Sequence, residues 1–423
     1  MAVKINEENL QKRIKFFPHE GQQKILNSNS RLKVICAGRR FGKTRIAAYE
    51  IIREALKGDK LIWAVGPDYD LARVVFEQAH MFLELILDPK SFSYEKKPIP
   101  RIKIQNGSVI ECKSGKNKKG MLGRATDLIV VDEAARLDDD IWYQYLKPTT
   151  HDKGARTIMI STPTGLNWFY DIWAEAGRGQ FHFKSTDNPY FSKEEWEDVL
   201  KTTPKSRIQQ EYLANFLADG TSVFQGIEEI IEGDFEQPRE GVGYLIGVDL
   251  AKQDDFTACV VMERATRRVV WIDRFNDMDY SVQKKRIVAL SKKYNSAKVI
   301  IDSSGPGDPI AEDIKRMVFT ESVSMHSAKV KQQLIEKLQI FIEQRLITIP
   351  NHEELIKELR QYASYSTESG TYRRFSAPKH KHDDIVMALA LAVYGVYAHN
   401  VNDDSDNEDV IRRRRLKVFN DYE

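Results

Sequence analysis

One short segment limits the fold of this chain more than any other. The apolar run Val34–Ala37 leads into a glycine-containing loop, and Lys43 and Thr44 then open a segment with helical periodicity. Strand, tight loop and helix in this order form the phosphate-binding loop of a parallel α/β domain, with Ala37 where the pattern has its first glycine. Loop amides and the helix N-terminus can bind phosphate. The residues expected to do so are Ala37, Gly38, Arg39, Arg40, Phe41, Gly42, Lys43 and Thr44.

Strands and helices alternate through the first half of the sequence. This alternation predicts a parallel sheet covered by helices. The expected strands are Lys33–Ala37, Leu61–Val65, Val109–Lys113, Leu128–Val131 and Thr157–Ile160, and the expected helices include Lys43–Leu56 and Asp70–Ile86. Further helices are expected at Ser192–Leu200, where Ser192 and Glu195 form a capping box, and at Lys205–Leu217.

The chain is longer than one hydrophobic core usually supports, since it has 423 residues. We expect one domain over 1–186, a linking segment over 187–233, a second domain over 234–400 and a mobile charged tail over 401–423. The net charge of +2 gives no argument for a DNA partner. The longest apolar run, Ile385–Ala398, is too short for a membrane span and predicts a buried helix.

Two carboxylates follow the apolar strand Leu128–Val131. Asp132 is placed to hold Mg²⁺ through water, and Glu133 to orient the attacking water in nucleotide hydrolysis. The two carboxylates could instead form an exposed acidic turn after a core strand. The phosphate loop upstream argues against this alternative. Ser161 and Thr162 end the next strand and either couple hydrolysis to movement or form a Ser/Thr turn.

Four other polar residues are candidates for nucleotide contact. A positive side chain on the γ-phosphate is expected, from Arg39 or Arg40 in the same subunit or from Arg124 of a neighbour in a ring. Each arginine could instead form a surface salt bridge. Gln22 could read the adenine edge or cap the helix that follows it.

The second half restarts as another α/β domain. Strands are expected at Tyr244–Val248, Thr257–Met262, Val269–Phe275, Lys298–Ile301 and Leu346–Ile349, helices at Ser281–Tyr294 and Val330–Gln344, and a hairpin over Tyr362–Ala377.

Aspartates stand at the ends of several of these elements. Asp249 and Asp302 each end a strand, and Asp383 and Asp384 open the apolar helix. Any one of them would more often be structural, but together they predict a site for two Mg²⁺ or Mn²⁺ ions that cleaves phosphodiesters. Asp255 is an auxiliary candidate, and Asp384 is favoured over Asp383 as the main ligand.

Basic stretches offer surfaces for the DNA backbone. Each could equally be a solvated face. They are Lys96, Lys97, Arg101 and Lys103; Lys113, Lys116, Lys118, Lys119 and Arg124; Arg373, Arg374, Lys379 and Lys381; and Arg412–Arg415 in the tail.

These motifs together resemble the large terminase subunit of tailed bacteriophages, from about Phe17 to about Tyr397. The resemblance rests on Ala37–Thr44, Val-Val-Asp132-Glu133, Ile-Ser161-Thr162-Pro163, Asn188-Pro189, Glu211-Tyr212, Gly-Val-Asp249, Ile-Ile-Asp302 and His382-Asp383-Asp384. It implies a P-loop ATPase domain over 1–186, a lid or linker subdomain over 187–233 and an RNase H-like nuclease domain over 234–400. It also implies ATP, Mg²⁺ at the ATPase site and double-stranded DNA.

The same resemblance implies a place in virus assembly. The family packages viral DNA into a procapsid in the host cytoplasm. Its subunits form a ring on the portal protein, work with a small terminase subunit, and can be monomers in solution. Two alternatives remain: a helicase-like repair enzyme with a nuclease domain, and a non-catalytic assembly adaptor. Intact Lys43, Glu133 and the three aspartates argue against the adaptor.

Overall fold

The chain folds into two compact units. The computed structural model describes residues 7–403 apart from 98, 122–123, 152, 219–220, 251–255, 305–306, 367–372 and 377–381. The first unit comprises the chain up to about residue 219 except 202–205, and the second comprises 202–205 and most of the chain from about residue 220. The segment 187–233 is divided between them, so its role as a separate lid stays a prediction. No helix in the described ranges is long and apolar enough to span a membrane.

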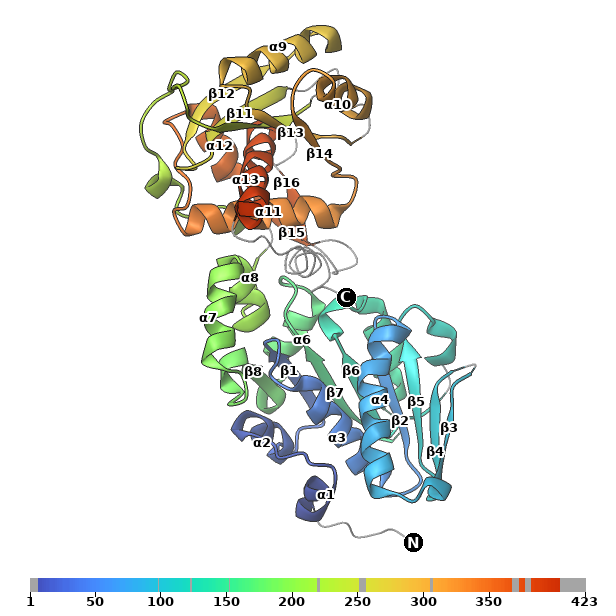
Figure 1. Ribbon diagram of the computed structural model, residues 1–423. Helices are drawn as coiled ribbons and strands as arrows, with labels where there is room; N and C mark the ends of the chain where they lie inside the picture. The colour runs from blue at the N-terminus through green and yellow to red at the C-terminus, as the bar shows by residue number, and fades with distance from the viewer. Residues whose placement is uncertain are drawn as a thin grey trace. The chain divides into compact units, whose positions relative to one another are not determined.

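An eight-stranded sheet forms the centre of the first unit (Figure 1). Its order is β3-β4-β5-β2-β6-β7-β1-β8. All neighbours from β5 to β8 pair in parallel, whereas β3, β4 and β5 pair antiparallel at one edge. The strands are β1 (Leu32–Ala37), β2 (Leu61–Gly66), β3 (Phe92–Glu95), β4 (Arg101–Ile104), β5 (Val109–Ser114), β6 (Leu128–Asp132), β7 (Arg156–Ser161) and β8 (Gln180–Phe183). The five predicted strands are confirmed, and β3, β4 and β8 were not predicted.

Helices cover both faces of this sheet. Alternate residues of each central strand enter two separate cores, one under α3 and α4 and the other under α6. The helices are α1 (Glu7–Arg13), α2 (Glu20–Asn27), α3 (Lys43–Ala55), α4 (Tyr69–Ile86), α5 (Lys147–Thr149), α6 (Trp168–Glu175), α7 (Lys193–Thr202) and α8 (Lys205–Arg207). Short helical turns are η1 (Pro89–Ser91), η2 (Lys118–Met121), η3 (Ala134–Arg136), η4 (Ile141–Leu146), η5 (Gly177–Gly179), η6 (Ser185–Asp187) and η7 (Ile208–Tyr212). The capping box of Ser192 and Glu195 is confirmed, with both hydrogen bonds at 3.1 Å.

A buried ion network holds α3 against the sheet. The ammonium of Lys33 on β1 lies 2.9 Å from the Glu50 carboxylate on α3 and donates to the backbone carbonyl of Ile25 at 2.8 Å. Arg156 on β7 bonds to Glu50 and to Glu54, at 3.1 and 2.8 Å. Breaking a buried pair leaves an uncompensated charge, so this network fixes the helix that begins at the phosphate loop.

The second unit is built on a five-stranded sheet of order β12-β11-β10-β13-β14. β10, β11 and β12 pair antiparallel, whereas β10, β13 and β14 pair in parallel. The strands are β10 (Tyr244–Asp249), β11 (Thr257–Glu263), β12 (Val269–Phe275), β13 (Lys298–Asp302) and β14 (Thr320–Val323). A small sheet of order β16-β15-β9 joins β16 (Arg373–Ser376), β15 (Ala363–Ser366) and β9 (Thr221–Ser222).

The predicted strands that correspond to β10, β11, β12 and β13 are confirmed. The predicted strand Leu346–Ile349 is wrong as a strand, because Thr348 and Ile349 make only isolated bridges. The helices are α9 (Tyr280–Lys293), α10 (Gly307–Lys315), α11 (Ala328–Glu343), α12 (Glu353–Gln361) and α13 (Asp384–Asp403), with the turn η8 (Ile227–Ile230). The helix α13 runs three residues past the expected start of the tail, and residues 404–423 lie outside the described chain.

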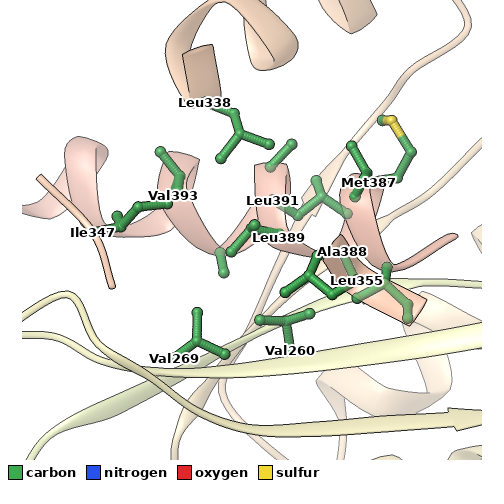
Figure 2. Close-up of a cluster of buried hydrophobic side chains, with 14 of the residues drawn as sticks. Val260, Val269, Leu338, Ile347, Leu355, Met387, Ala388, Leu389, Leu391 and Val393 are labelled. Carbon is green, nitrogen blue, oxygen red and sulfur yellow. The ribbon is translucent and has the colours of Figure 1, made fainter. Parts of the chain in front are cut away.

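The apolar helix α13 is the centre of this unit's core. Figure 2 shows Val260 and Val269 of the sheet on one side of α13, with Leu338 of α11 on the other. Helix and sheet touch at Gly247 in the middle of β10. A Cβ atom there would lie 2.0 Å from the carbonyl oxygen of Ala388 and 2.5 Å from the amide nitrogen of Ala392. Only a glycine permits this approach, which sets the position of α13 on β10.

Gly247→Ala should therefore push α13 off β10. We expect the free energy of unfolding to fall by about 1–3 kcal/mol, the usual range for overpacking a core. Urea denaturation followed by tryptophan fluorescence, to which Trp271 on β12 contributes, measures it. The matched control is Gly243→Ala, where the nearest atom to the new methyl group lies at 3.6 Å. Equal stability of the two variants would contradict the close approach.

Candidate nucleotide and metal sites

The predicted phosphate loop lies between β1 and α3, beside a pocket of about 820 Å³. Gly42 has φ of 95° and Arg40 has φ of 64°, so the loop turns through left-handed conformations before α3 begins. The pocket is lined by Lys15, Phe16, Phe17, His19, Gln22, Arg39, Arg40, Phe41, Gly42, Lys43, Thr44, Arg45, Glu133, Asn188, Tyr190 and Phe191. Eight of the predicted nucleotide residues thus face one pocket.

Lys43 is held at the centre of the loop. Its ammonium donates to the carbonyl oxygens of Ala37 and Gly38 at 2.8 and 2.9 Å. Burial lowers the pKa of Lys43, and the carboxylates of Glu133 and Asp132 oppose that shift. The ammonium is therefore held by the loop carbonyls and feels the charges of the two acidic residues at the end of β6.

The two acidic residues at the end of β6, Asp132 and Glu133, have a shifted pKa and a strained backbone, respectively. Burial, followed by the neighbouring Glu133, raises the pKa of Asp132 to about 7, while Lys43 opposes the rise. Glu133 has φ of 48°, a left-handed conformation that costs a non-glycine residue energy. Such strain is often found at functional sites. The Glu133 amide donates to Oδ1 of Asp132 at 2.9 Å, which ties the Asp132 side chain to the backbone of this turn.

Ser161 lies next to Glu133. Its hydroxyl oxygen is 3.3 Å from Oε2 of Glu133 and 2.6 Å from the carbonyl oxygen of Thr162, and it accepts the amide of Ala135 at 3.2 Å. Both Ser161 and Thr162 are buried. The structure therefore brings the two predicted coupling residues to the acidic end of the site, joined to the turn that carries Glu133.

Both loop arginines pair with carboxylates from later in the chain. Nε of Arg39 lies 2.9 Å from Glu211, whose backbone carbonyl also accepts the Arg39 amide at 2.7 Å. Arg40 lies 3.2 Å from Glu195 on α7. The salt-bridge alternative is thus realised for both, although both side chains also line the pocket. The loop approaches this later segment so closely that a Cβ at Gly38 would lie 2.3 Å from the carbonyl oxygen of Tyr212.

Several loop contacts were missed from the sequence. The Ser185 hydroxyl donates to the carbonyl oxygen of Arg39, and the Asn188 amide to that of Arg40, both at 2.6 Å. The only available signal was that Asn188 and Glu211 fall within stretches that match the terminase pattern.

Gln22 has its polar atoms engaged within the protein. Its carbonyl oxygen accepts the amide of His19 at 3.2 Å, as a capping residue of α2 does, and its amide group donates to the carbonyl of Gly42 at 3.2 Å. The capping alternative is therefore observed. Its contact with Gly42 also braces the phosphate loop from the side.

Arg124 does not line the pocket of its own chain. Its guanidinium lies 2.7 Å from the buried carboxylate of Glu111, which also pairs with Arg101 and Lys113, both at 2.9 Å. Lys118 pairs with Asp140 at 2.6 Å. Much of the two amino-terminal basic stretches is therefore engaged in ion pairs.

The acidic residues of the second unit converge. β10 and β13 pair in parallel with Val248 opposite Ile301, so Asp249 and Asp302 follow at the ends of neighbouring strands. Asp384 is the first residue of α13, one turn before the Ala388 contact with Gly247. Burial, and then the charges of Asp384, Asp302 and Asp383, raises the pKa of Asp249 well above its usual range. These four carboxyl groups therefore share one electrostatic environment.

Cations accompany this acidic group. Arg274 on β12 lies 3.3 Å from Asp384, and Lys331 on α11 lies 3.3 Å from Asp383. Within the described ranges, no three His, Cys, Asp or Glu side chains are arranged to hold one ion, and Asp255 lies outside those ranges. Carboxylate oxygens are the ligands that Mg²⁺ prefers, and their mutual repulsion favours a bound cation. The oxygen donors thus fit a hard divalent ion by their chemistry, although their side chains are not arranged around one ion in the described residues.

Comparison with known proteins gives matches to both halves of the chain. The model described as terminase large subunit, T4likevirus-type, N-terminal, matches residues 34–230, and the terminase RNaseH-like domain matches residues 246–394. The terminase large subunit of Thermus virus P23-45 is 30% identical, over 89% of this chain and 87% of that protein.

Solved structures of large terminases are similar to this chain. One from a thermophilic bacteriophage is 14% identical, covers 90% of this chain and all of its own, and has a TM-score of 0.56. The large terminase nuclease of phage G20c with bound magnesium is 33% identical over 41% of this chain and 96% of its own, with a TM-score of 0.39. This chain belongs to the phage terminase large subunit family, with an ATPase domain followed by an RNase H-like nuclease domain.

Proposed function

We propose that the first unit uses ATP hydrolysis to move double-stranded DNA into a procapsid, and that the second cuts concatemeric DNA when packaging starts and ends. Membership of the terminase family implies DNA and packaging proteins as partners. The observation that carries the proposal is the strained Glu133, set beside Lys43 and Asp132 at the nucleotide pocket. A glutamate in this position can activate water, so the arrangement supports hydrolysis of the nucleotide rather than binding alone.

At the ATPase site each residue would have a separate task. The loop amides and Lys43 would hold the β- and γ-phosphates, and Thr44 and Asp132 would hold Mg²⁺. Glu133 would orient the attacking water and accept its proton. Arg39 or Arg40 would stabilise the γ-phosphate within the subunit, and Arg124 would do so from a neighbouring subunit in a ring.

Coupling of hydrolysis to movement would start at the acidic turn. The hydrogen bonds of Ser161 to the turn that carries Glu133 give a route by which a change at the γ-phosphate reaches β7. Thr162 would take part through its carbonyl oxygen, 2.6 Å from that hydroxyl. Residues 187–233 would act as the lid, because Arg39 and Arg40 are tied to Glu211 and Glu195.

In the second unit, Asp249, Asp302 and Asp384 would bind two Mg²⁺ or Mn²⁺ ions, with Asp383 and Asp255 as auxiliary ligands. Two such ions stabilise the attacking and the leaving oxygen of a phosphodiester. The residues themselves would orient the ions and set their spacing. Arg274 and Lys331 would balance the negative charge and stand near the DNA phosphates.

The resemblance to the family also suggests specific partners and an assembly state. We propose a ring of this chain on the portal protein, a small terminase subunit as partner, a monomer in free solution, and action in the host cytoplasm. Strand displacement in the absence of a portal would instead favour the helicase-like alternative.

Glu133→Gln should stop ATP turnover and leave DNA cutting intact. Loss of the base should lower the rate by about 10²–10⁴-fold. Phosphate release and plasmid cleavage measure the two activities. Glu194→Gln, an exposed change on α7, is the control. Loss of both activities in a folded Glu133→Gln protein would falsify the two-site proposal.

Asp302→Ala should have the opposite effect. Removing a shared ligand should lower plasmid cleavage by roughly 100-fold or more, because both ions lose their alignment. ATP turnover should stay at the wild-type rate. The matched control is Asp313→Ala, an aspartate of α10 that pairs with Lys284 instead. Unchanged cleavage by Asp302→Ala would remove Asp302 from the metal site.

Metal binding should stabilise the second unit in a pH-dependent way. Because the pKa of folded Asp249 is raised, the folded state binds more protons than the unfolded state above about pH 4, and stability falls as pH rises from there toward the folded pKa. A bound cation removes this cost. Mn²⁺ should therefore raise the Tm more at about pH 8 than at about pH 5.5. Scanning calorimetry with and without EDTA measures the shift, and an equal shift at both values would contradict the assignment.

A further inference from the structure

Glu358 on α12 is a buried carboxylate that no predicted site included. Its Oε2 accepts the backbone amides of Ile385 at 2.9 Å and Val386 at 3.1 Å. These amides belong to the first turn of α13, where no carbonyl of the same helix can accept them. Glu358 therefore caps α13 from a different helix, in the place that a local N-cap side chain usually takes.

The first turn of α13, which Glu358 caps, is adjacent to Asp383 and begins with Asp384. Asp384 immediately precedes Ile385, and the carbonyl of Asp383 accepts the amide of Met387 at 2.9 Å. The direction of the Asp384 side chain therefore depends on how the two following amides are held. A change at Glu358 would reach Asp384 through one peptide unit.

Arg274 joins the same two carboxylates. Its Nη2 lies 3.3 Å from Asp384 and 3.8 Å from Oε1 of Glu358. The guanidinium also lies 3.8 Å from the centre of the Phe256 ring, which limits its movement. Glu358 thus acts on Asp384 in two ways, through the backbone of α13 and through a shared arginine.

The body of α13 does not depend on this cap. Further along the helix, Ala388 and Ala392 are fixed against Gly247, and the apolar core surrounds the remaining turns. Loss of the cap would therefore free mainly the first turn. A purely structural role for Glu358 would instead affect the stability of the whole unit.

We propose that Glu358 is a positioning residue of the nuclease metal site, whose hydrogen bonds to the first turn of α13 direct Asp384 toward Asp249 and Asp302. This inference rests on the proposed function of those aspartates as metal ligands. Residues that orient metal ligands typically change metal affinity or activity by about 10–100-fold when they are removed.

The test compares three variants of the full chain. Glu358→Ala removes the acceptor, Glu358→Gln keeps an oxygen for the same two amides, and Glu358→Asp is too short to reach both. Mn²⁺ binding is measured from the electron paramagnetic resonance signal of free Mn²⁺, and plasmid cleavage is measured against Mn²⁺ concentration.

We expect Glu358→Ala to weaken Mn²⁺ binding about 10–100-fold and to cleave at nearly the wild-type rate once Mn²⁺ saturates. Glu358→Gln should stay within about three-fold of wild type, because its amide oxygen accepts the same bonds. Glu358→Asp should lie between them. Hydrogen exchange of the peptide containing Ile385 and Val386 should be faster in Glu358→Ala alone.

A matched control is Glu263→Ala. Glu263 is another buried carboxylate of this unit; it pairs with Arg239, and it lies opposite Tyr244, at the far end of β10 from Asp249. It should leave the Mn²⁺ midpoint unchanged.

Three results would overturn the proposal. They are an unmoved Mn²⁺ midpoint in Glu358→Ala with only a lower maximal rate, a Glu358→Gln variant as impaired as Glu358→Ala, and an equal midpoint shift in the Glu263→Ala control. If Glu358→Ala does not fold, Glu358→Asp decides by the same midpoint. A folded wild-type protein that binds no Mn²⁺ would refute the metal site itself, and the positioning role with it.

Discussion

Parallel pairing brings together the ends of strands that lie far apart in the sequence. β6, β7 and β1 are neighbours in the first sheet, so Asp132, Ser161 and the loop after Ala37 meet at one edge. In the second sheet the parallel pair β10 and β13 brings Asp249 beside Asp302. Because parallel strands end at the same edge, the backbone ladder assembles the first set of catalytic candidates and brings Asp249 and Asp302 together in the second. Asp384 joins that second set through the packing of α13 on β10.

At the edge of each sheet where these residues meet, several charged side chains are buried close together. Lys43 offsets Asp132 and Glu133 in the first unit, and Arg274 and Lys331 offset the aspartates in the second. Buried charges need such partners, since the interior solvates them poorly. The supporting groups lie one layer away: Ser161 bonds to the Glu133 turn, and Glu358 bonds to the turn of Asp384. In each unit, the turn that carries the acidic candidates is therefore hydrogen-bonded by a side chain from another element.

Patterns of apolar residues predicted most of the elements but missed five strands, which are β3, β4, β8, β9 and β14. β4 holds the alternating Arg101–Ile104, whose charged members led to its interpretation as a basic stretch, and the short β3 and β8 also lack a continuous apolar run. The predicted helix Lys205–Leu217 is in fact the short α8 followed by the wider turn η7. The propensity of these short segments is weak, and their pairing with neighbouring strands stabilises them; β8, for example, pairs with β1 from the start of the chain.

The sequence by itself determined the two kinds of domain, their order and the identity of the residues at the strand ends, because motif spacing and apolar periodicity are local properties. Only the tertiary structure decided which groups support them. Arg124 meets Glu111, Gln22 braces Gly42, and Glu358 caps the turn of Asp384. Each of these contacts joins residues from separate elements, so it depends on how helices pack on sheets. The close approach of the α13 backbone to Gly247 also depends on the tertiary structure. A glycine in a strand indicates that another backbone can approach, but the sequence does not tell which helix does so.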